Sequence, residues 1–311
     1  MPDPIHAPAG MPASGKLLTI TIPTYNRATY VEKLLNSLQW EFDRMDRGTV
    51  EQVEIITANN NSTDQTSLVL ERIKKELSNL EVITQPRNVG PYENMLSCMA
   101  QAKGRWIWLH GDDDISVPLG FAALLRILQK DEADYVILYD KNFKRPFSGE
   151  FRGSIREFVR FCSEKEPYLL LEHSLITSNV FKKELLDPQE MRRWNDTDYG
   201  HLYSLMRGAL EVNARVCVPE FDVFHVPEER PPFECWPKNI DESWCDYLRW
   251  LSGKSGVEID TNRAMEYTRS RLKSELRHPL RFVRKNYLNL FRPGAYPFLF
   301  KRLMTLFYKK N

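Results

Sequence analysis

The chain has 311 residues, of which 42% are hydrophobic and 27% charged, and its formal net charge is +1. This composition is typical of a globular protein with a substantial core, and the balanced charge excludes a globally basic nucleic-acid binder. The charge is unevenly distributed, because residues 269–311 hold twelve Lys and Arg against one acid, Glu275, a net charge of +11, so the remainder sums to −10. The sequence therefore predicts an acidic body with a basic C-terminal arm.

The cysteines and the N-terminal residues indicate the cellular compartment in which the protein is expected. Five cysteines occur, and none forms a CxxC pair, which favours a reducing compartment and argues against a structural zinc site. Residues 1–15 lack the basic start and apolar core of a signal peptide, so we interpret them as a disordered tail. No apolar run approaches the ~20 residues needed to cross a bilayer. The protein is therefore expected to be soluble or to sit on a membrane surface.

The first half of the chain alternates strand-like runs with helical patterns. In chain order, strands are expected at 17–22, 53–57, 81–84, 105–109 and 135–139. Helices are expected after the capping boxes Thr29–Glu32 and Ser62–Gln65, from Pro91, and over 117–128. Repeated β-α units imply an α/β fold, with a mostly parallel sheet flanked by helices on both faces. Ligands bind beyond the carboxyl ends of such strands, where the polar loops fall.

The pattern is weaker after Asp140. A helix is expected over 199–210, and two short strands around Pro219 within 215–226. Residues 227–241 are rich in Pro and acid, which indicates a loop or boundary. We predict one domain over 16–230, divided at residue 140, and a C-terminal helical extension over 231–311 that is basic from residue 269.

The strongest chemical signal is the run Asp112-Asp113-Asp114, directly after the expected strand 105–109. Three carboxylates at a strand end repel one another unless something positive lies among them. Oxygen ligands suit Mg²⁺ or Mn²⁺, and such an ion would bridge a diphosphate. The alternative is a solvated acidic turn, or carboxylates placed at the N-terminus of the helix that follows Val117.

Four ordered motifs resemble those of the family 2 glycosyltransferases, inverting enzymes with the GT-A (Rossmann-like) fold. Residues 22–27 (IPTYNR) resemble the opening motif, and 58–66 (ANNNSTDQT) resemble the segment DNxSTDxT. Asn88-Val89-Gly90 with Asn94 resembles NxGxxxN, and 108–114 (WLHGDDD) resembles the DxD region. The motifs cover residues 17–133, so the resemblance implies a GT-A fold for this part of the chain.

The resemblance also implies roles for individual positions. Asp113, aligned with the second Asp of DxD, would hold the metal, with Asp114 and His225 as further candidate ligands. Asn59 stands where the family usually has an Asp that contacts the base, a departure that leaves the base open. For Arg87 an ordinary surface ion pair is the alternative. The candidates for contact with the nucleotide sugar are Pro23, Thr24, Tyr25, Arg27, Asn59, Asn60, Arg87, Asn88, Gly90, Asn94 and Asp112.

An inverting transfer needs a general base that takes the proton of the acceptor hydroxyl. In the family this base is an Asp of the second half, and the candidates here are Asp198 first and Asp196 second. Either could instead cap the helix that follows. We interpret His201 as structural, and residues 172–181 resemble the stretch beside the acceptor site. Three tryptophans are candidates for stacking on sugar rings or for packing in a core: Trp194, Trp236 and Trp244.

The basic arm interleaves Arg and Lys with Leu, Phe and Tyr. Such an amphipathic segment suits an anionic membrane surface, where each cation contributes about 1 kcal/mol. The alternative is a terminal helix packed on the domain with a solvated basic face. No nucleic-acid motif accompanies the charge, so nucleic acid is not an expected partner.

The sequence thus predicts a cytoplasmic, metal-dependent hexosyl- or related sugar transferase, peripheral on the inner face of the cell membrane. It would move a sugar from a nucleotide-diphosphate donor, bound by residues 16–140, to a glycan acceptor, bound by 141–230. The expected acceptor is lipid-linked, in bacterial lipopolysaccharide or capsule synthesis. Short motifs do not identify the sugar, the base, the acceptor or the linkage.

Two other functions compete with this prediction. A sugar-nucleotide pyrophosphorylase would need a Gly-rich loop with Arg and Lys after the first strand, which residues 23–27 do not provide. A non-catalytic homologue that binds nucleotide sugars or acts as a scaffold is kept open by Asn59 and opposed by the intact acidic run.

Overall fold

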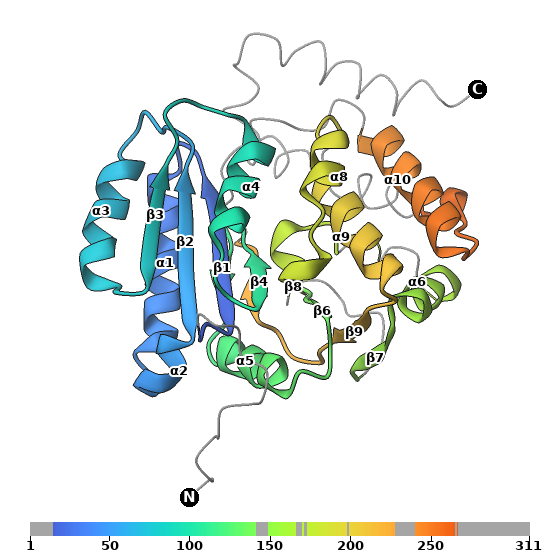
Figure 1. Ribbon diagram of the computed structural model, residues 1–311, viewed down its shortest axis with the longest axis horizontal. Coiled ribbons are helices and arrows are strands. Elements are labelled where there is room, and N and C mark those ends of the chain that lie inside the picture. The colour runs from blue at the N-terminus through green and yellow to red at the C-terminus, as the bar shows by residue number, and fades with distance from the viewer. Residues whose placement is uncertain are drawn as a thin grey trace, which may run out of the picture.

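The computed structural model describes residues 15–140, 149–165, 170, 173–197, 199–227, 240–264 and 266 (Figure 1). The strands are β1 (Leu18–Thr24), β2 (Val53–Asn59), β3 (Leu80–Thr84), β4 (Trp106–Leu109), β5 (Ile115–Ser116), β6 (Tyr135–Ile137), β7 (Phe151–Ser154), β8 (Asn179–Lys182), β9 (Arg215–Val218) and β10 (Phe224–His225). The helices are α1 (Ala28–Phe42), α2 (Arg47–Glu51), α3 (Thr66–Glu76), α4 (Pro91–Gln101), α5 (Gly120–Lys130), α6 (Ile155–Glu164), α8 (Pro188–Arg193), α9 (Gly200–Glu211) and α10 (Ile240–Ser255).

One eight-stranded sheet organises the fold, in the order β3-β2-β1-β4-β8-β6-β9-β7, and β5 pairs with β10 in a separate ribbon. Strand β1 runs parallel to β2 and β4, β2 to β3, and β6 to β9. Strand β8 lies antiparallel between β4 and β6, and β7 is antiparallel to β9. The mostly parallel sheet expected from the sequence is confirmed.

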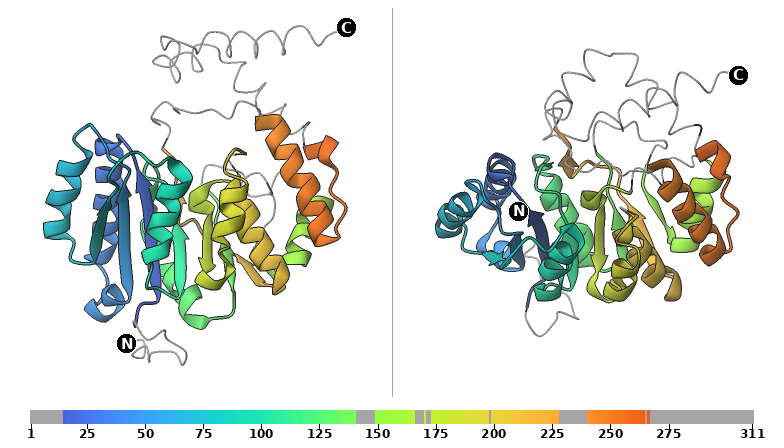
Figure 2. Two further views of the ribbon diagram at one scale, coloured as in Figure 1. Left: turned by 45° about the horizontal axis from the view of Figure 1, so that its top comes forward. Right: turned by 90° about the horizontal axis from the view of Figure 1, so that it is seen from above.

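Side chains of each strand alternate between two cores, because successive residues of a strand point to opposite faces. Trp106 and Trp108 of β4 lie in one core with residues of α1, α3 and α5. Ile107 and Leu109 of the same strand lie in the other core, with residues of α4, α6, α9 and α10. Helices therefore cover both faces of the sheet, as predicted (Figure 2).

Both predicted capping boxes are wrong, although the two helices exist. Helix α1 begins at Ala28, before Thr29, and no side chain of its own N-terminus caps it. Its first amide, Ala28 N, instead donates to Asp64 Oδ2 at 3.2 Å, across to the loop after β2. The Ser62 hydroxyl accepts from Asn26 N at 2.9 Å rather than capping α3, which begins at Thr66. The first amide of α3, Thr66 N, instead donates to Asp64 Oδ1 at 2.9 Å, so Asp64 serves the start of both helices.

Helix α10 packs into the same core as α9, through Trp244, Tyr247, Leu248 and Leu251. Trp244 is 1% exposed, so of its two expected roles core packing is confirmed. Within the described part of the chain, no helix combines the length and apolar content needed to cross a bilayer. The expected N-terminal tail, apart from Gly15, and the basic arm, together with Trp236, lie outside the described residues, and the domain division stays a prediction.

Candidate functional site

The loops after β1 and β2 interlock at the carboxyl edge of the sheet. Asn26, at a positive φ of 54°, accepts from Thr63 N through its side chain at 2.7 Å. Asn60 N donates to Thr24 O at 2.9 Å, and Arg27 N donates to Thr66 Oγ1 at 3.0 Å. The two loops therefore hold each other, and together they fix where the Arg27 side chain begins. Pro23 and Tyr25, two further predicted site residues, are half-buried in the same segment.

A buried amide joins the loops after β2 and β3, and we call this arrangement the amide clasp (Asn60, Asn88, Val89 and Gly90). Asn60 is 3% exposed; its Oδ1 accepts from Val89 N at 2.8 Å. Its Nδ2 donates to Asn88 Oδ1 at 2.9 Å and to Gly90 O at 3.3 Å. Gly90 has a φ of 86°, a backbone conformation that residues other than glycine rarely adopt. The clasp fixes the start of helix α4 at Pro91.

Two further predicted site amides are also engaged within the protein. Asn59, 1% exposed, accepts from Ser62 N at 3.0 Å and donates to Ser67 Oγ at 2.8 Å. Asn94 donates to Ala58 O at 2.8 Å and accepts from Gln85 Nε2 at 3.3 Å. Both side chains therefore build the loops, and Asn59 does so with donor and acceptor atoms alike.

Two carboxylates share one guanidinium at the ends of β1 and β4; we call Thr24, Arg27, Asp112 and Asp113 the carboxylate cluster. Thr24 Oγ1 donates to Asp112 Oδ2 at 2.7 Å. Arg27 Nη1 lies 3.2 Å from Asp113 Oδ2 and 3.6 Å from Asp112 Oδ1. Burial raises the pKa of Asp112 to about 7, the Arg27 charge opposes this rise, and the Asp113 charge adds to it. The cluster holds one positive group for two acids.

The third carboxylate of the run points elsewhere. Asp114 is 6% exposed and accepts a hydrogen bond from Thr177 Oγ1, which itself accepts from Gly111 N at 2.8 Å. A Cβ on Gly111 would lie 3.1 Å from Asp114 Oδ2 and 3.3 Å from Asp113 Oδ1. A side chain at position 111 would therefore crowd both carboxylates.

His225 lies beside the acidic run, because β10 pairs with β5 and places His225 opposite Ile115. Its Nδ1 is 3.7 Å from Asp140 Oδ1, and Asp140 Oδ2 accepts from Val226 N at 3.0 Å. No three His, Cys, Asp or Glu side chains among the described residues form a group that could hold a metal alone. Asp113 and Asp114 are neighbours in the chain, and strand pairing brings His225 beside Ile115. The three predicted metal ligands nevertheless do not form one group that could bind an ion.

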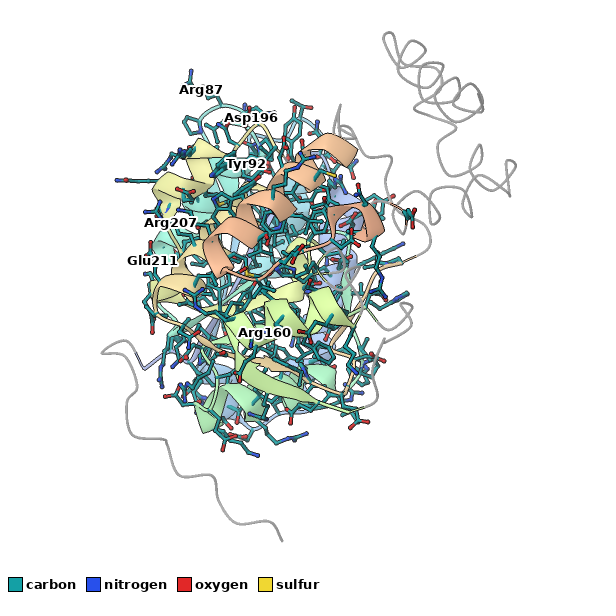
Figure 3. The ribbon with its side chains drawn as sticks, turned by 90° about the vertical axis from the view of Figure 1, so that its right-hand side faces the viewer. Arg87, Tyr92, Arg160, Asp196, Arg207 and Glu211 are labelled. Carbon is teal, nitrogen blue, oxygen red and sulfur yellow. The ribbon has the colours of Figure 1, made fainter. Side chains whose placement is uncertain are left out.

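The remaining predicted residues lie on the rim or outside the description. Arg87 and Asn88 are exposed in the loop after β3. Figure 3 shows Arg87 and Asp196 near the same end of the molecule, the end toward which β1, β2 and β3 run. Asp196 is exposed, and Asp198 lies outside the described residues.

Sequence reasoning missed Thr177 and Asp140 as members of this edge. Asp140 follows strand β6, so the rule that polar residues at carboxyl ends of parallel strands form sites would have found it. Thr177 lies in the stretch 172–181 that was expected beside the acceptor site, but no local signal reveals its bond to Asp114, 63 residues away.

Comparisons with known proteins bear on the family and the fold. Residues 19–168 match the family model of Glycosyl transferase family 2. The GalNAc(5)-diNAcBac-PP-undecaprenol beta-1,3-glucosyltransferase of Campylobacter jejuni is 28% identical over 59% of this chain and 56% of its own. Abequosyltransferase RfbV of Salmonella typhimurium is 27% identical over 61% of this chain and 60% of its own. The chain thus spans less than two thirds of the length of either relative.

Among solved structures, S. aureus TarS 1-349 superposes with a TM-score of 0.56 at 17% identity, over 86% of this chain and 78% of that one. At this identity the likeness concerns the fold alone, and it agrees with the predicted GT-A architecture. The match of the family model assigns residues 19–168 to glycosyl transferase family 2.

Proposed function

We propose that this protein is an inverting glycosyltransferase that moves a sugar from a nucleotide-diphosphate donor to a glycan acceptor. The observation that carries the proposal is the carboxylate cluster, in which Asp112 and Asp113 share Arg27 at the carboxyl edge of a family 2 domain. Two acids with one cation attract a further positive charge, and this edge of the sheet is where such folds bind ligands.

The donor is proposed to lie along the ends of β1 and β4. Pro23, Thr24, Tyr25 and Arg27 would border the nucleotide, and Asp112 the ribose or the sugar. Support comes from S. aureus TarS 1-349, a protein of similar fold whose crystal structure includes a complex with UDP-GlcNAc. In this proposal five residues act through the loops that they hold, since their polar groups are hydrogen-bonded within the protein: Asn59, Asn60, Asn88, Gly90 and Asn94.

A divalent ion, Mn²⁺ or Mg²⁺, is the proposed cofactor. The residues fit it in kind, because Asp113 offers carboxylate oxygens, and Mg²⁺ is commonly held by one or two carboxylates together with substrate phosphates. Asp113 is therefore the proposed ligand, with Asp114 and His225 as candidates that would have to leave Thr177 and Asp140. When bound, the ion would stabilise the leaving diphosphate.

The acceptor side is proposed to supply the general base. Asp196, exposed in the turn between α8 and α9, is the candidate within the described residues, and Asp198 remains the other. One of these carboxylates would take the proton of the acceptor hydroxyl.

A lipid-linked glycan is the proposed acceptor, in the synthesis of a bacterial surface polysaccharide. The support is the name of the Campylobacter jejuni relative, which specifies an undecaprenol-linked acceptor. The proposed location is the inner face of the cell membrane, with the basic residues 269–311 on the anionic surface.

A thermal-shift screen tests the donor site. UDP, GDP, CDP and dTDP are each added with Mn²⁺ or with EDTA to the wild type, to Asp113→Ala and to Asp43→Asn, an exposed acid at the end of α1 that serves as the control. One nucleotide should raise the melting temperature of the wild type and the control with Mn²⁺ only, and leave Asp113→Ala unchanged. If no nucleotide stabilises well-folded wild type, the enzyme proposal fails and a non-catalytic scaffold takes its place.

A further inference from the structure

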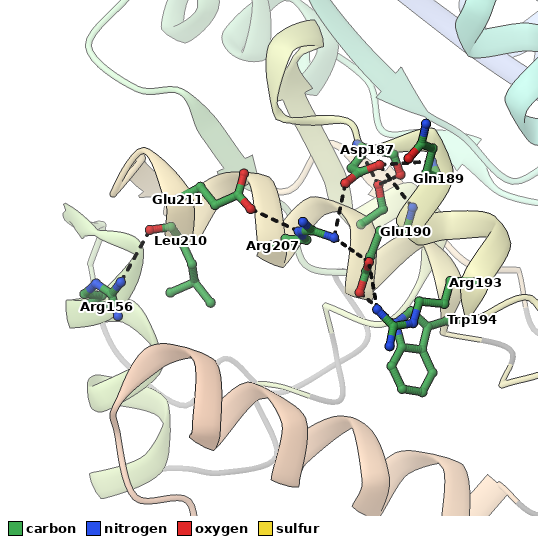
Figure 4. A network of polar contacts seen from close by, with 10 residues as sticks. Arg156, Asp187, Gln189, Glu190, Arg193, Trp194, Arg207, Leu210 and Glu211 are labelled. Carbon is green, nitrogen blue, oxygen red and sulfur yellow. Dashed lines mark hydrogen bonds and ion pairs between the residues drawn. The ribbon is translucent and has the colours of Figure 1, made fainter.

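A buried carboxylate ties helix α8 both to the turn that follows it and to helix α9 (Figure 4). Glu190 is 4% exposed, and its Oε1 accepts from Trp194 Nε1 at 2.8 Å. Its Oε2 accepts from Arg207 Nη1 on α9 at 2.6 Å. Arg207 also bonds through Nε to Glu211 Oε1 at 3.0 Å, on the exposed side of α9. Both oxygens of Glu190 are therefore used to join elements rather than to meet solvent.

Aromatic packing fixes both ends of the turn between the helices. The Trp194 ring stacks on Tyr203 at 4.1 Å with an interplanar angle of 7°. At the far end Tyr199 packs against Trp244 at 5.3 Å. These contacts occupy one face of Trp194 and its only N–H, so the ring is an anchor within the protein.

Between the anchors runs the acidic turn, which we define as residues 194–197. Thr197 donates to Trp194 O through its amide at 3.2 Å and through its hydroxyl at 2.7 Å, whereas Asp196 is exposed. The turn thus has a fixed backbone and an outward carboxylate. The position of the turn depends on Trp194, because Thr197 donates both of these hydrogen bonds to the Trp194 carbonyl.

Helix α8 is also fastened to the donor half of the molecule. Arg192 donates to both carboxylate oxygens of Glu93 on α4, at 2.7 and 3.1 Å. A Cβ on Gly200 would lie 2.8 Å from Met191 O and 3.0 Å from the Tyr92 ring, so α9 begins in close contact with both helices. The two helices that flank the acidic turn are therefore held against α4, the helix that starts at the amide clasp.

We infer that Glu190, with Trp194 and Arg207, positions the acidic turn for chemistry on the acceptor. This inference rests on the proposed function, in which a carboxylate of this region takes the acceptor proton. The three are positioning residues, since they touch one another and the turn rather than a reacting atom. Loss of the Glu190 bridge lets the turn move while the carboxylate cluster, on β1 and β4, keeps its geometry.

Two variants break the bridge in different ways. Glu190→Gln removes the charge that meets Arg207, and Trp194→Phe keeps an aromatic ring on Tyr203 but loses the bond to Glu190. The matched control is Glu211→Gln, which removes another partner of Arg207 beside Glu190 and Asp187, and leaves the bridge to Trp194 intact. If Glu190→Gln does not fold, Trp194→Phe still decides the question.

The measurements are kcat, donor KM and hydrogen exchange of the amides of residues 194–197 in the full chain. We expect kcat to fall by about 10- to 100-fold in both variants, since small misplacements of reacting groups have effects of this size. Donor KM should change less than twofold, and the turn amides should exchange faster. The control should match the wild type in all three.

Other outcomes separate the two proposals. Unchanged kcat or unchanged exchange in both variants, with an active wild type, would overturn this inference alone. A donor KM that rises as much as kcat falls would also overturn it, because the effect would then not be confined to the acceptor side. A folded wild type that transfers no sugar would overturn the proposed function and the catalytic part of this inference together.

Discussion

The amide clasp and the carboxylate cluster lie at the same edge of the sheet but are built from opposite kinds of group. The clasp is neutral, and its central side chain, Asn60, makes all its hydrogen bonds within the protein. In the cluster, Asp112 and Asp113 compete for one guanidinium, and burial holds the pKa of Asp112 near 7. The polar residues of the predicted motifs therefore have two roles. Some fix the loops, and others provide the charge that would bind a ligand. Substitutions in the two regions should separate stability from activity.

Asp113→Ala should have the largest effect, on activity. Sugar transfer is expected to fall on the order of 10³-fold, because the proposed metal ligand is lost and an ion of this kind contributes several kcal/mol to catalysis. The free energy of unfolding should not fall, since a like charge beside Asp112 is removed. Steady-state transfer assays and urea unfolding check the two halves of this statement. Equal loss of activity in the control Asp43→Asn would contradict it.

Asn60→Ala should show the reverse pattern. The variant leaves Val89 N, Asn88 Oδ1 and Gly90 O without their partner, so the free energy of unfolding should fall by about 2–3 kcal/mol. At saturating donor, kcat should stay within about tenfold of the wild type because the carboxylate cluster is untouched. Urea unfolding of Asn60→Ala beside Asn36→Ala, an exposed amide on α1, provides the comparison. A kcat loss as large as that of Asp113→Ala would remove the distinction between the regions.

Acid pH should destabilise the protein through groups outside the clasp, which has no titratable side chain. Burial lowers the pKa of His110 and His201 to about 4 and that of His173 to about 3, whereas the unfolded value is ~6.5. As the pH falls, these histidines are therefore protonated in the unfolded chain before they are protonated in the native state. The free energy of unfolding that they contribute above pH ~6.5 is lost as the pH falls toward 4.

Asp112 opposes this trend, because its pKa is raised and the native state binds its proton first as the pH falls through about 7. From pH 7 to 5.5 the wild type should lose about 2 kcal/mol, and Asp112→Asn, which lacks the opposing group, about 4 kcal/mol. Urea unfolding in EDTA across this range gives both numbers. Identical slopes for the two proteins would show that the carboxylate does not titrate as described.

Glycines in the two regions provide the smallest test. Gly90→Ala forces alanine to a φ of 86° with no atom within 4 Å of the new Cβ, so about 1–2 kcal/mol of stability should be lost through backbone strain. Gly111→Ala instead crowds Asp113 and Asp114 at ordinary φ, so its main effect should be on donor binding. Thermal shift with and without the stabilising nucleotide distinguishes the two. If Gly90→Ala weakened nucleotide binding and Gly111→Ala did not, the roles assigned to the two glycines would be reversed.

The parallel part of the fold was predictable because its strands are buried on both faces. Strands β1, β2 and β4 are almost wholly buried, so they read as short runs rich in apolar and β-branched residues, followed by polar loops. Strand β8 was missed because it begins with Asn179 and ends with Lys182. Each is buried by a distant partner: Tyr135 donates to Asn179, and Lys182 pairs with Asp134 at 2.7 Å.

The site was predictable in its membership but not in its directions. The acidic run and the asparagines were found from their place after strands, yet the sequence does not reveal that Asp114 turns to Thr177 while Asp112 and Asp113 turn to Arg27. These directions depend on residues 63 or more positions away in the chain. The start of α1 was mispredicted for the same reason, since its partner Asp64 lies in the loop after β2, whereas α3 uses the same Asp64 two residues before its first amide.

Strand β8 separates β4 from β6 in the sheet, although both precede it in the chain. During synthesis, neither strand can gain its final neighbour until residues 179–182 have left the ribosome. Until then the four buried residues of β4, Trp106–Leu109, present an open apolar edge of the kind that associates with other chains. Nascent chains arrested before residue 183 are therefore expected to bind chaperones that completed chains no longer need. Synthesis of β8 thus ends the exposure of the β4 edge, and β9, which pairs with β6 and β7, completes the sheet later.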